Sequence, residues 1–125
     1  MNWSNKEILI TGGTGSLGTT LVKSLLLNHK PKGIRIFSRD EQKQHKMKPE
    51  ISQLIELNHL TTSVSYLIGD VRNFDRLRLA MKNVDVVIHT AAMKHITACE
   101  DNPNEAIFTN ISGSQNVLFS AVENT

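Results

Sequence analysis

The stretch TGGTGSLG, residues 11–18, is the part of this sequence that decides the fold. It follows EILIT at residues 7–11, a short apolar run rich in β-branched side chains that is typical of a strand. After the stretch, leucines recur with helical spacing up to His29. The pattern therefore predicts a strand, a tight glycine turn and a helix in succession.

Three glycines in this turn have the spacing of a phosphate-binding loop. Gly12 would permit the tight turn, Gly15 would let the backbone approach a pyrophosphate, and Gly18 would let the helix pack closely on the strand. The amino end of the helix would then face the phosphates with free N–H groups and a partial positive charge. Glycines also punctuate ordinary loops, so a plain structural turn is the alternative. The strand before the turn and the helix after it favour phosphate binding.

The rest of the chain alternates short apolar runs with longer amphipathic ones. We expect further strands at 34–37, 64–68 and 84–89, and helices within 40–55, at 75–82 and at 104–122. The apolar runs are continuous, as in parallel strands that are buried on both faces. Pro49 predicts a break or an irregular first half in the second helix. The sum is the first half of a Rossmann-type doubly wound α/β sheet, with about four parallel strands in one domain covering residues 1–125.

The composition indicates one ordinary soluble domain of 125 residues with a formal net charge of +2. The apolar stretches are far shorter than the roughly 20 residues of a membrane span. The amino end has no signal-peptide pattern, and the single Cys99 has no partner for a disulfide or a CxxC metal site. We therefore expect a cytoplasmic protein without a membrane span or a metal centre.

Half of the 14 basic residues lie between positions 30 and 48. This segment faces either an anionic ligand or water. Nucleic acid is not favoured as a partner, because aromatic side chains that could stack on bases are not interleaved with the cations.

The end of the second predicted strand bears on the choice of cofactor. An NAD-binding domain has a carboxylate about 20 residues beyond the glycines, which holds the ribose 2′-hydroxyl. This chain has Ser38 and Arg39 there, and a hydroxyl followed by a guanidinium suits a 2′-phosphate. Lys43 would add a second cation. NADP is therefore preferred over NAD, although Asp40 keeps NAD open, and Arg39 would otherwise pair with Asp40 or Glu41 on the surface.

The ends of the third and fourth predicted strands supply the other candidate cofactor contacts. Asp70 would accept from the adenine amino group while Val71 packs on the ring, or Asp70 is a turn or helix-cap aspartate. Thr90, Ala91 and Ala92 are small, which leaves room for the pyrophosphate and ribose or lets a helix pack closely. His89, inside the strand, is expected to be a packed and hydrogen-bonded histidine.

The chain resembles the extended short-chain dehydrogenase/reductases, because five segments occur in the order found in that family. They are TGGTGSLG, IFSRDEQKQ, IGDVRN, VDVVIHTAAMKHI and TNISGSQNV. More narrowly, the chain resembles the UDP-N-acetylglucosamine 4,6-dehydratases of the bacterial polysaccharide-biosynthesis group. SRDE-x-KQ and AA-x-KH narrow the resemblance, which covers nearly the whole chain. The family binds NADP, oxidises the sugar at C4, eliminates water across C5 and C6, and returns the hydride to C6.

The resemblance implies a role for several positions of this sequence. The phosphate turn would be Thr14, Gly15, Ser16 and Leu17, and the 2′-phosphate loop would run from Ser38 to Lys43. Lys94 and His95 would lie beside the nicotinamide and the sugar, and Asn110 would support the active site. A cation and an imidazole just past a strand's carboxyl end would face the ligand crevice, or else form a solvated loop pair.

Several positions depart from the family pattern. Asn73 follows GDVR where the family has aspartate, Thr90 replaces an alanine, and Thr97 replaces a proline. The family's Tyr-x-x-x-Lys, whose tyrosinate acts as the base, falls beyond residue 125, and the single Tyr66 lies in a predicted strand. We therefore expect the cofactor half of a dehydratase, inactive alone, as a fragment or a shortened gene product.

Other functions remain open at this point. A non-catalytic NADP-binding or docking module would need no tyrosine. A nucleotide-sugar epimerase or reductase of the same superfamily would use the same cofactor residues. The expected partners are a UDP-sugar and, because the fourth strand would leave a sheet edge unpaired, further copies of the chain in a homo-oligomer.

Overall fold

The fold is seen in a computed structural model that describes residues 2–90. The elements, in chain order, are η1 (Trp3–Asn5), β1 (Glu7–Thr11), α1 (Ser16–Ser24), η2 (Leu25–His29), β2 (Gly33–Ser38), α2 (Glu41–Leu57), β3 (Ser63–Ile68), α3 (Phe74–Ala80) and β4 (Val86–His89). All strands and helices expected before residue 90 are present, with ends shifted by a few residues. The helix expected at 104–122 lies outside the described residues.

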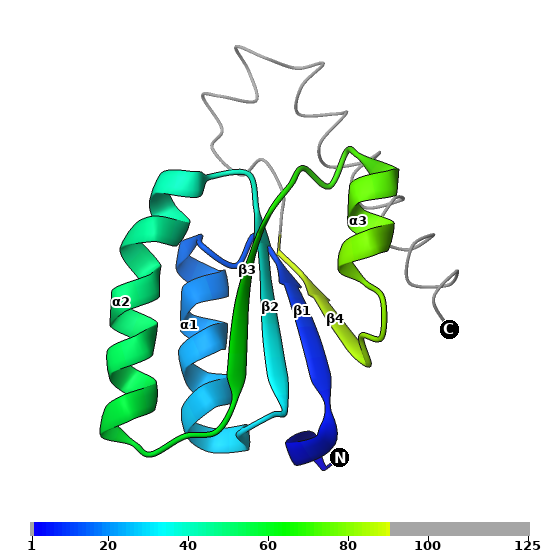
Figure 1. The fold of residues 1–125 in the computed structure, drawn as a ribbon. Coiled ribbons are helices and arrows are strands. Elements are labelled where there is room, and N and C mark those ends of the chain that lie inside the picture. The colour runs from blue at the N-terminus through cyan, green and yellow to red at the C-terminus, as the bar shows by residue number, and fades with distance from the viewer. Residues whose placement is uncertain (1, 91–125) are drawn as a thin grey trace.

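The four strands form one parallel sheet in the order β3-β2-β1-β4. Figure 1 shows α1 and α2 on one face of this sheet and α3 on the other. Each helix connects two parallel strands, and the change of face after β3 lets β4 pair with the free side of β1. The expectation of a doubly wound half-sheet is confirmed.

Two apolar clusters fill the two sides of the sheet. On the side of α1 and α2 lie side chains from β1, β2, α1, η2 and α2: Ile8, Ile10, Val22, Leu25, Leu26, Ile34, Ile36, Met47 and Ile51. Under α3 lie Leu9, Phe37, Val71, Leu77, Ala80 and Met81. Neighbouring residues of β1 and β2 point to opposite faces, so each strand supplies apolar side chains to both clusters, and Arg35 is the charged exception in β2.

The expectation that every strand is buried on both faces is wrong for β3. Ser63 and Ser65 are exposed, and Ile68 is 42% exposed. β3 pairs only with β2 and forms an edge of the described sheet, and the face that bears Ser63 and Ser65 is exposed there. Serines alternate with Val64 and Tyr66, which pack against the α2-side cluster, and this alternation is the sequence signal for a half-covered strand.

The expected break at Pro49 is also wrong, because α2 runs without interruption from Glu41 to Leu57. Proline removes one N–H from the helix and releases the carbonyl of His45, four residues earlier. Both residues are exposed, so water can bond the released carbonyl. Met47 and Ile51, on either side of the proline, are buried against the sheet, and this packing keeps the helix continuous.

Arg35 joins three elements at the opposite end of the sheet from the glycine turn. Its Nε lies 3.2 Å from a Glu7 carboxylate oxygen, and its Nη1 donates to the carbonyls of Ala80 and Lys82, each at 2.7 Å. One guanidinium thus binds β1 and the end of α3 to β2. This cation of the basic segment has a structural role.

Candidate functional site

The candidate site lies at the carboxyl ends of the strands, where the chain order in the sheet reverses. β1 is flanked by β2 on one side and β4 on the other, so the connections that follow β1 and β3 run to opposite faces. In doubly wound sheets, ligands bind in the crevice at this switch point. The glycine turn, which follows β1, occupies that position.

Gly12 and Gly18 are required by the protein itself. Gly12 has a φ of 68°, in the left-handed region where side chains are disfavoured. A Cβ on Gly18 would stand 2.3 Å from the Gly12 carbonyl oxygen and 2.6 Å from the Cα of Gly13, and both are backbone atoms. Gly18 therefore allows α1 to pack directly on the turn, whereas the sequence predicts close packing on the strand.

Gly15 is different, because the protein leaves its side open. A Cβ there would meet only the Gly12 carbonyl oxygen, at 3.5 Å, which is an ordinary contact. Its φ of −74° also suits any residue. Nothing in the described protein requires glycine at this position. The open space is what a pyrophosphate approaching the backbone would fill.

The amino end of α1 has no side-chain cap, unlike the other two α-helices of the described region. Asp40 caps α2 by accepting from the Lys43 N–H, and Asn73 caps α3 by accepting from the Arg76 N–H. Gly15, at the N-cap of α1, has no side chain to offer. The first N–H groups of α1 are thus left for an anion, at the positive end of the helix dipole.

Thr90 fastens the glycine turn to the end of β4. Its hydroxyl donates to the carbonyls of Thr11 and Gly12, at 2.6 and 3.1 Å, and its N–H donates to the Thr11 hydroxyl at 3.1 Å. An alanine, the residue that the resemblance leads one to expect here, would lack the hydroxyl bonds. The small size of Thr90 was visible in the sequence, but this clamp was not.

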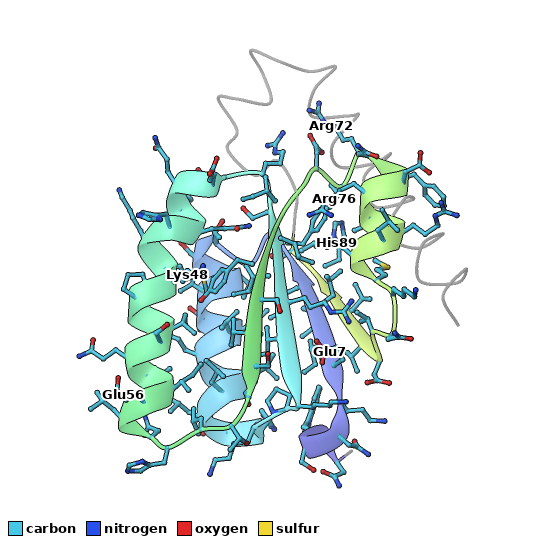
Figure 2. All side chains as sticks on the ribbon, in the orientation of Figure 1. Glu7, Lys48, Glu56, Arg72, Arg76 and His89 are labelled. Carbon is cyan, nitrogen blue, oxygen red and sulfur yellow. The ribbon has the colours of Figure 1, made fainter. Side chains whose placement is uncertain are left out.

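His89 lies beneath the turn, and Figure 2 shows it between the sheet and α3. Its Nδ1 is 2.6 Å from the Thr11 hydroxyl oxygen, so it is hydrogen-bonded as expected. Burial disfavours the imidazolium and lowers the pKa of His89 below its ordinary value. The folded state therefore favours the neutral imidazole of His89.

Stability is expected to fall as the pH drops below about 6.5, the ordinary histidine pKa. The unfolded chain binds a proton at His89 in this range while the folded chain resists it, so the loss continues down to the lowered folded pKa. Thermal unfolding between pH 7.5 and 5 measures the effect. A His89→Gln variant should lose less stability over this range than the parent chain; an equal loss in both would show that His89 is not responsible.

Ser38 braces the turn against the end of β2. Its hydroxyl oxygen lies 2.8 Å from the Thr14 hydroxyl oxygen and accepts from the Asp40 N–H at 3.1 Å. The residue is only 7% exposed. Ser38 thus joins the glycine turn to the loop that leads into α2, and Asp40, as the α2 cap, is already engaged.

Arg39 lies beside Asp70, and the alternative that it pairs with Asp40 or Glu41 on the surface is wrong. Its side chain is 57% exposed, and its Nη1 stands 3.8 Å from the Asp70 Oδ2. The carboxyl ends of β2 and β3 bring the two residues together. Lys43, in the first turn of α2, is exposed. The described structure therefore leaves Arg39 accessible at the edge of the site.

Asp70 forms a turn that holds Arg72. Its Oδ1 accepts from the Arg72 N–H at 2.9 Å, and its Oδ2 accepts from Nε and Nη2 at 2.9 and 2.7 Å. Burial alone would raise the pKa of Asp70, but the hydrogen bonds and charge of Arg72, together with the charge of Arg39, lower it overall. Asp70 is thus a carboxylate held between two guanidinium groups.

The remaining predicted site residues divide into three groups. Ser16 and Leu17 are exposed at the start of α1. Val71 is 4% exposed and packs in the α3-side cluster, so its side chain offers almost no surface for an adenine ring. Ala91, Ala92, Lys94, His95 and Asn110 lie outside the described residues. Arg72 and the Thr90 clamp are contributors that the sequence pattern did not reveal.

Residues 2–90 contain neither a candidate membrane span nor a candidate metal site. No helix among them is both long and apolar enough to span a membrane. No three or more histidine, cysteine or acidic side chains gather there as a group able to hold a metal ion.

Comparison with known proteins identifies a family and several relatives that this chain resembles. A family model described as "Polysaccharide biosynthesis protein" matches residues 8–125. A UDP-N-acetylglucosamine 4,6-dehydratase (inverting) of Campylobacter jejuni strain 81-176 is 52% identical over 98% of this chain and 34% of its own length. A UDP-glucose 4-epimerase of Rickettsia typhi is 46% identical over 96% of the chain and 34% of its own length. The chain thus spans about a third of these relatives.

Two solved structures share the fold. Pen from Bacillus thuringiensis is 44% identical, with a TM-score of 0.87 over 99% of this chain and 36% of that one. The dTDP-glucose 4,6-dehydratase DesIV from Streptomyces venezuelae, solved with NAD and TYD bound, is 21% identical, with a TM-score of 0.75 over 94% of this chain and 36% of that one. The family match extends over nearly all residues, and by it the chain belongs to the polysaccharide biosynthesis protein family.

Proposed function

We propose that this chain is the NADP-binding part of a nucleotide-sugar 4,6-dehydratase that acts on UDP-N-acetylglucosamine. The observation that carries the cofactor proposal is the open side of Gly15 at the uncapped start of α1. The fold needs glycine at 12 and 18 for its own packing, but a glycine at 15 is explained by a ligand that must come close to the backbone. The substrate proposal is supported by the Campylobacter relative.

Each part of the cofactor would have its own contacts at the carboxyl edge of the sheet. The pyrophosphate would lie over Gly15 and bind N–H groups of Ser16 and Leu17. The 2′-phosphate would bind Arg39 and Lys43, and Asp70 would accept from the adenine amino group. When bound, NADP supplies the acceptor for the hydride removed from C4 of the sugar. Thr90 and Ser38 would hold the turn in place for it.

The proposed catalytic surroundings come from residues beyond the described range. Ala91 and Ala92 would leave room for the pyrophosphate and ribose, and Lys94 and His95 would lie beside the nicotinamide and the sugar. Asn110 would support the active site. These assignments rest on the family resemblance.

The side chains at the end of β2 support NADP over NAD. Asp40, the carboxylate nearest to the NAD position, accepts from the Lys43 N–H as the cap of α2. The Ser38 hydroxyl, which the sequence suggested for the 2′-phosphate, is buried and bonded to Thr14, so the preference rests on Arg39, which is exposed beside the site. DesIV shares the fold and was solved with NAD bound, so the fold alone does not require the phosphorylated cofactor. The guanidinium is the feature that selects the phosphorylated one.

Replacing Arg39 with alanine is therefore expected to weaken NADP binding by about ten- to hundredfold, the value of one charged hydrogen-bonded pair. NAD binding should change little, because NAD lacks the 2′-phosphate. Calorimetric titration of parent and variant with both cofactors measures the two affinities. Equal losses for NADP and NAD would contradict the assignment of Arg39 to the 2′-phosphate.

The substrate is tested on the complete gene product, with UDP-N-acetylglucosamine and NADP. A 4-keto-6-deoxy sugar nucleotide is the expected product. The second candidate is a nucleotide-sugar 4-epimerase, which the Rickettsia relative favours. A C4 epimer that retains its 6-hydroxyl would support the epimerase and rule out the dehydratase.

A further inference from the structure

Asp70 places a negative charge next to Arg39, the guanidinium that we assign to the 2′-phosphate. Arg39 Nη1 and Asp70 Oδ2 are 3.8 Å apart, a separation at which opposite charges attract even near the surface. A 2′-phosphate that binds Arg39 must compete with this carboxylate and is also repelled by it. Left to itself, Asp70 would thus oppose the phosphorylated cofactor.

Arg72 counteracts this effect by binding the same oxygen more closely. Its Nη2 and Nε lie 2.7 and 2.9 Å from Asp70 Oδ2, about an ångström nearer than Arg39. The Arg72 N–H also holds Oδ1, at 2.9 Å. These three Arg72 contacts orient the Asp70 carboxylate toward Arg72 and offset its negative charge. Figure 2 shows Arg72 at the carboxyl end of the sheet, above Arg76 and His89.

We propose that Arg72 sets the preference for a 2′-phosphorylated cofactor by holding Asp70 and so releasing Arg39 for the phosphate. The inference rests on the proposed function, because it concerns the same site. Arg39, Asp70 and Arg72 together carry a net charge of +1, whereas Arg39 and Asp70 alone carry none. Arg72 is a positioning residue, since it acts on the 2′-phosphate through Asp70 and Arg39.

The test is the ratio of NADP affinity to NAD affinity, measured by calorimetric titration of the folded chain at low salt. In an Arg72→Ala variant, Asp70 loses its closest cation and draws Arg39 to itself. We expect the ratio to fall about tenfold, equivalent to about 1.4 kcal/mol. The drop should shrink at high salt, because added ions screen exposed charges.

Two control variants separate this role from support of the loop. In Arg72→Ala/Asp70→Asn the competing charge is gone, so the NADP to NAD ratio should return to the parent value even if both affinities are weaker. Arg76→Ala removes another arginine of the same region, whose Nε donates to the Ile68 carbonyl at 3.0 Å. That variant should leave the ratio unchanged.

The outcomes also distinguish this inference from the proposed function. A parent chain that binds neither cofactor would overturn the proposed function itself. A parent chain that prefers NADP, with an Arg72→Ala variant that loses both cofactors equally, would overturn only the role of Arg72. A double variant that fails to recover the ratio would likewise overturn it.

Discussion

A Gly18→Ala variant is expected to lose about 3 kcal/mol of folding stability, the upper part of the usual range for overpacking. The added methyl would stand 2.3 Å from the Gly12 carbonyl oxygen and 2.6 and 2.8 Å from two backbone atoms of Gly13. Because these are backbone atoms of a turn that carries a φ of 68°, α1 must move away from β1 to admit it. Urea unfolding followed by circular dichroism measures the loss.

A stability within about 0.5 kcal/mol of the parent, the range of an ordinary surface substitution, would contradict this close packing. Gly15 supplies the matched control, because it belongs to the same turn and has an open side. The same unfolding measurement on a Gly15 variant shows whether the cost is specific to position 18.

A Gly15→Ser variant is expected to bind NADP about a hundredfold more weakly while folding at least as well as the parent, since contacts to a phosphate are worth up to about 3 kcal/mol. Serine at an N-cap stabilises a helix by a few tenths of a kcal/mol relative to glycine. Its φ and ψ of −74° and 175° suit a capping serine. The hydroxyl, however, would take the N–H groups and the space that the pyrophosphate needs.

The two readouts of this variant therefore move in opposite directions. Unfolding in urea measures the stability, and calorimetric titration measures the affinity for NADP. A Gly15→Ser variant that binds NADP as tightly as the parent would show that no phosphate approaches this position. A variant that fails to fold would contradict the open space beside Gly15.

The fold could be predicted where a short stretch of sequence is compatible with only one local structure. EILIT followed by glycines at 12, 15 and 18 specifies strand, turn and helix, because the turn needs a positive φ at Gly12 and room at Gly18. Leucine spacing placed the helix that ends near His29. Local periodicity thus sufficed for the elements and for the parallel sheet.

The parts that failed depend on tertiary surroundings. Pro49 breaks an isolated helix, but packing of Met47 and Ile51 on the sheet keeps α2 continuous. The apolar run at 64–68 predicts a strand buried on both faces, whereas β3 forms an edge of the described sheet and its Ser65 is exposed. Neither outcome is encoded within a short window of sequence.

Side-chain partners of the site were the least predictable feature. The sequence offers Asp40 and Glu41 as neighbouring ion-pair partners of Arg39, but the strand register brings Arg39 to Asp70, 31 positions later. The Thr90 hydroxyl reaches the glycine turn from β4, 78 residues away from Gly12. Such contacts depend on which strands are neighbours in the sheet. A residue pattern indicates the class of fold but not these individual side-chain contacts.

We propose that this chain carries a phosphate-binding turn with a guanidinium that selects NADP. Calorimetric titration of the parent chain with NADP and with NAD, after circular dichroism has shown that it is folded, tests the claim most directly. Saturable binding of both, with NADP the tighter, is the predicted result. Binding of neither cofactor, or NAD bound as tightly as NADP, would contradict it.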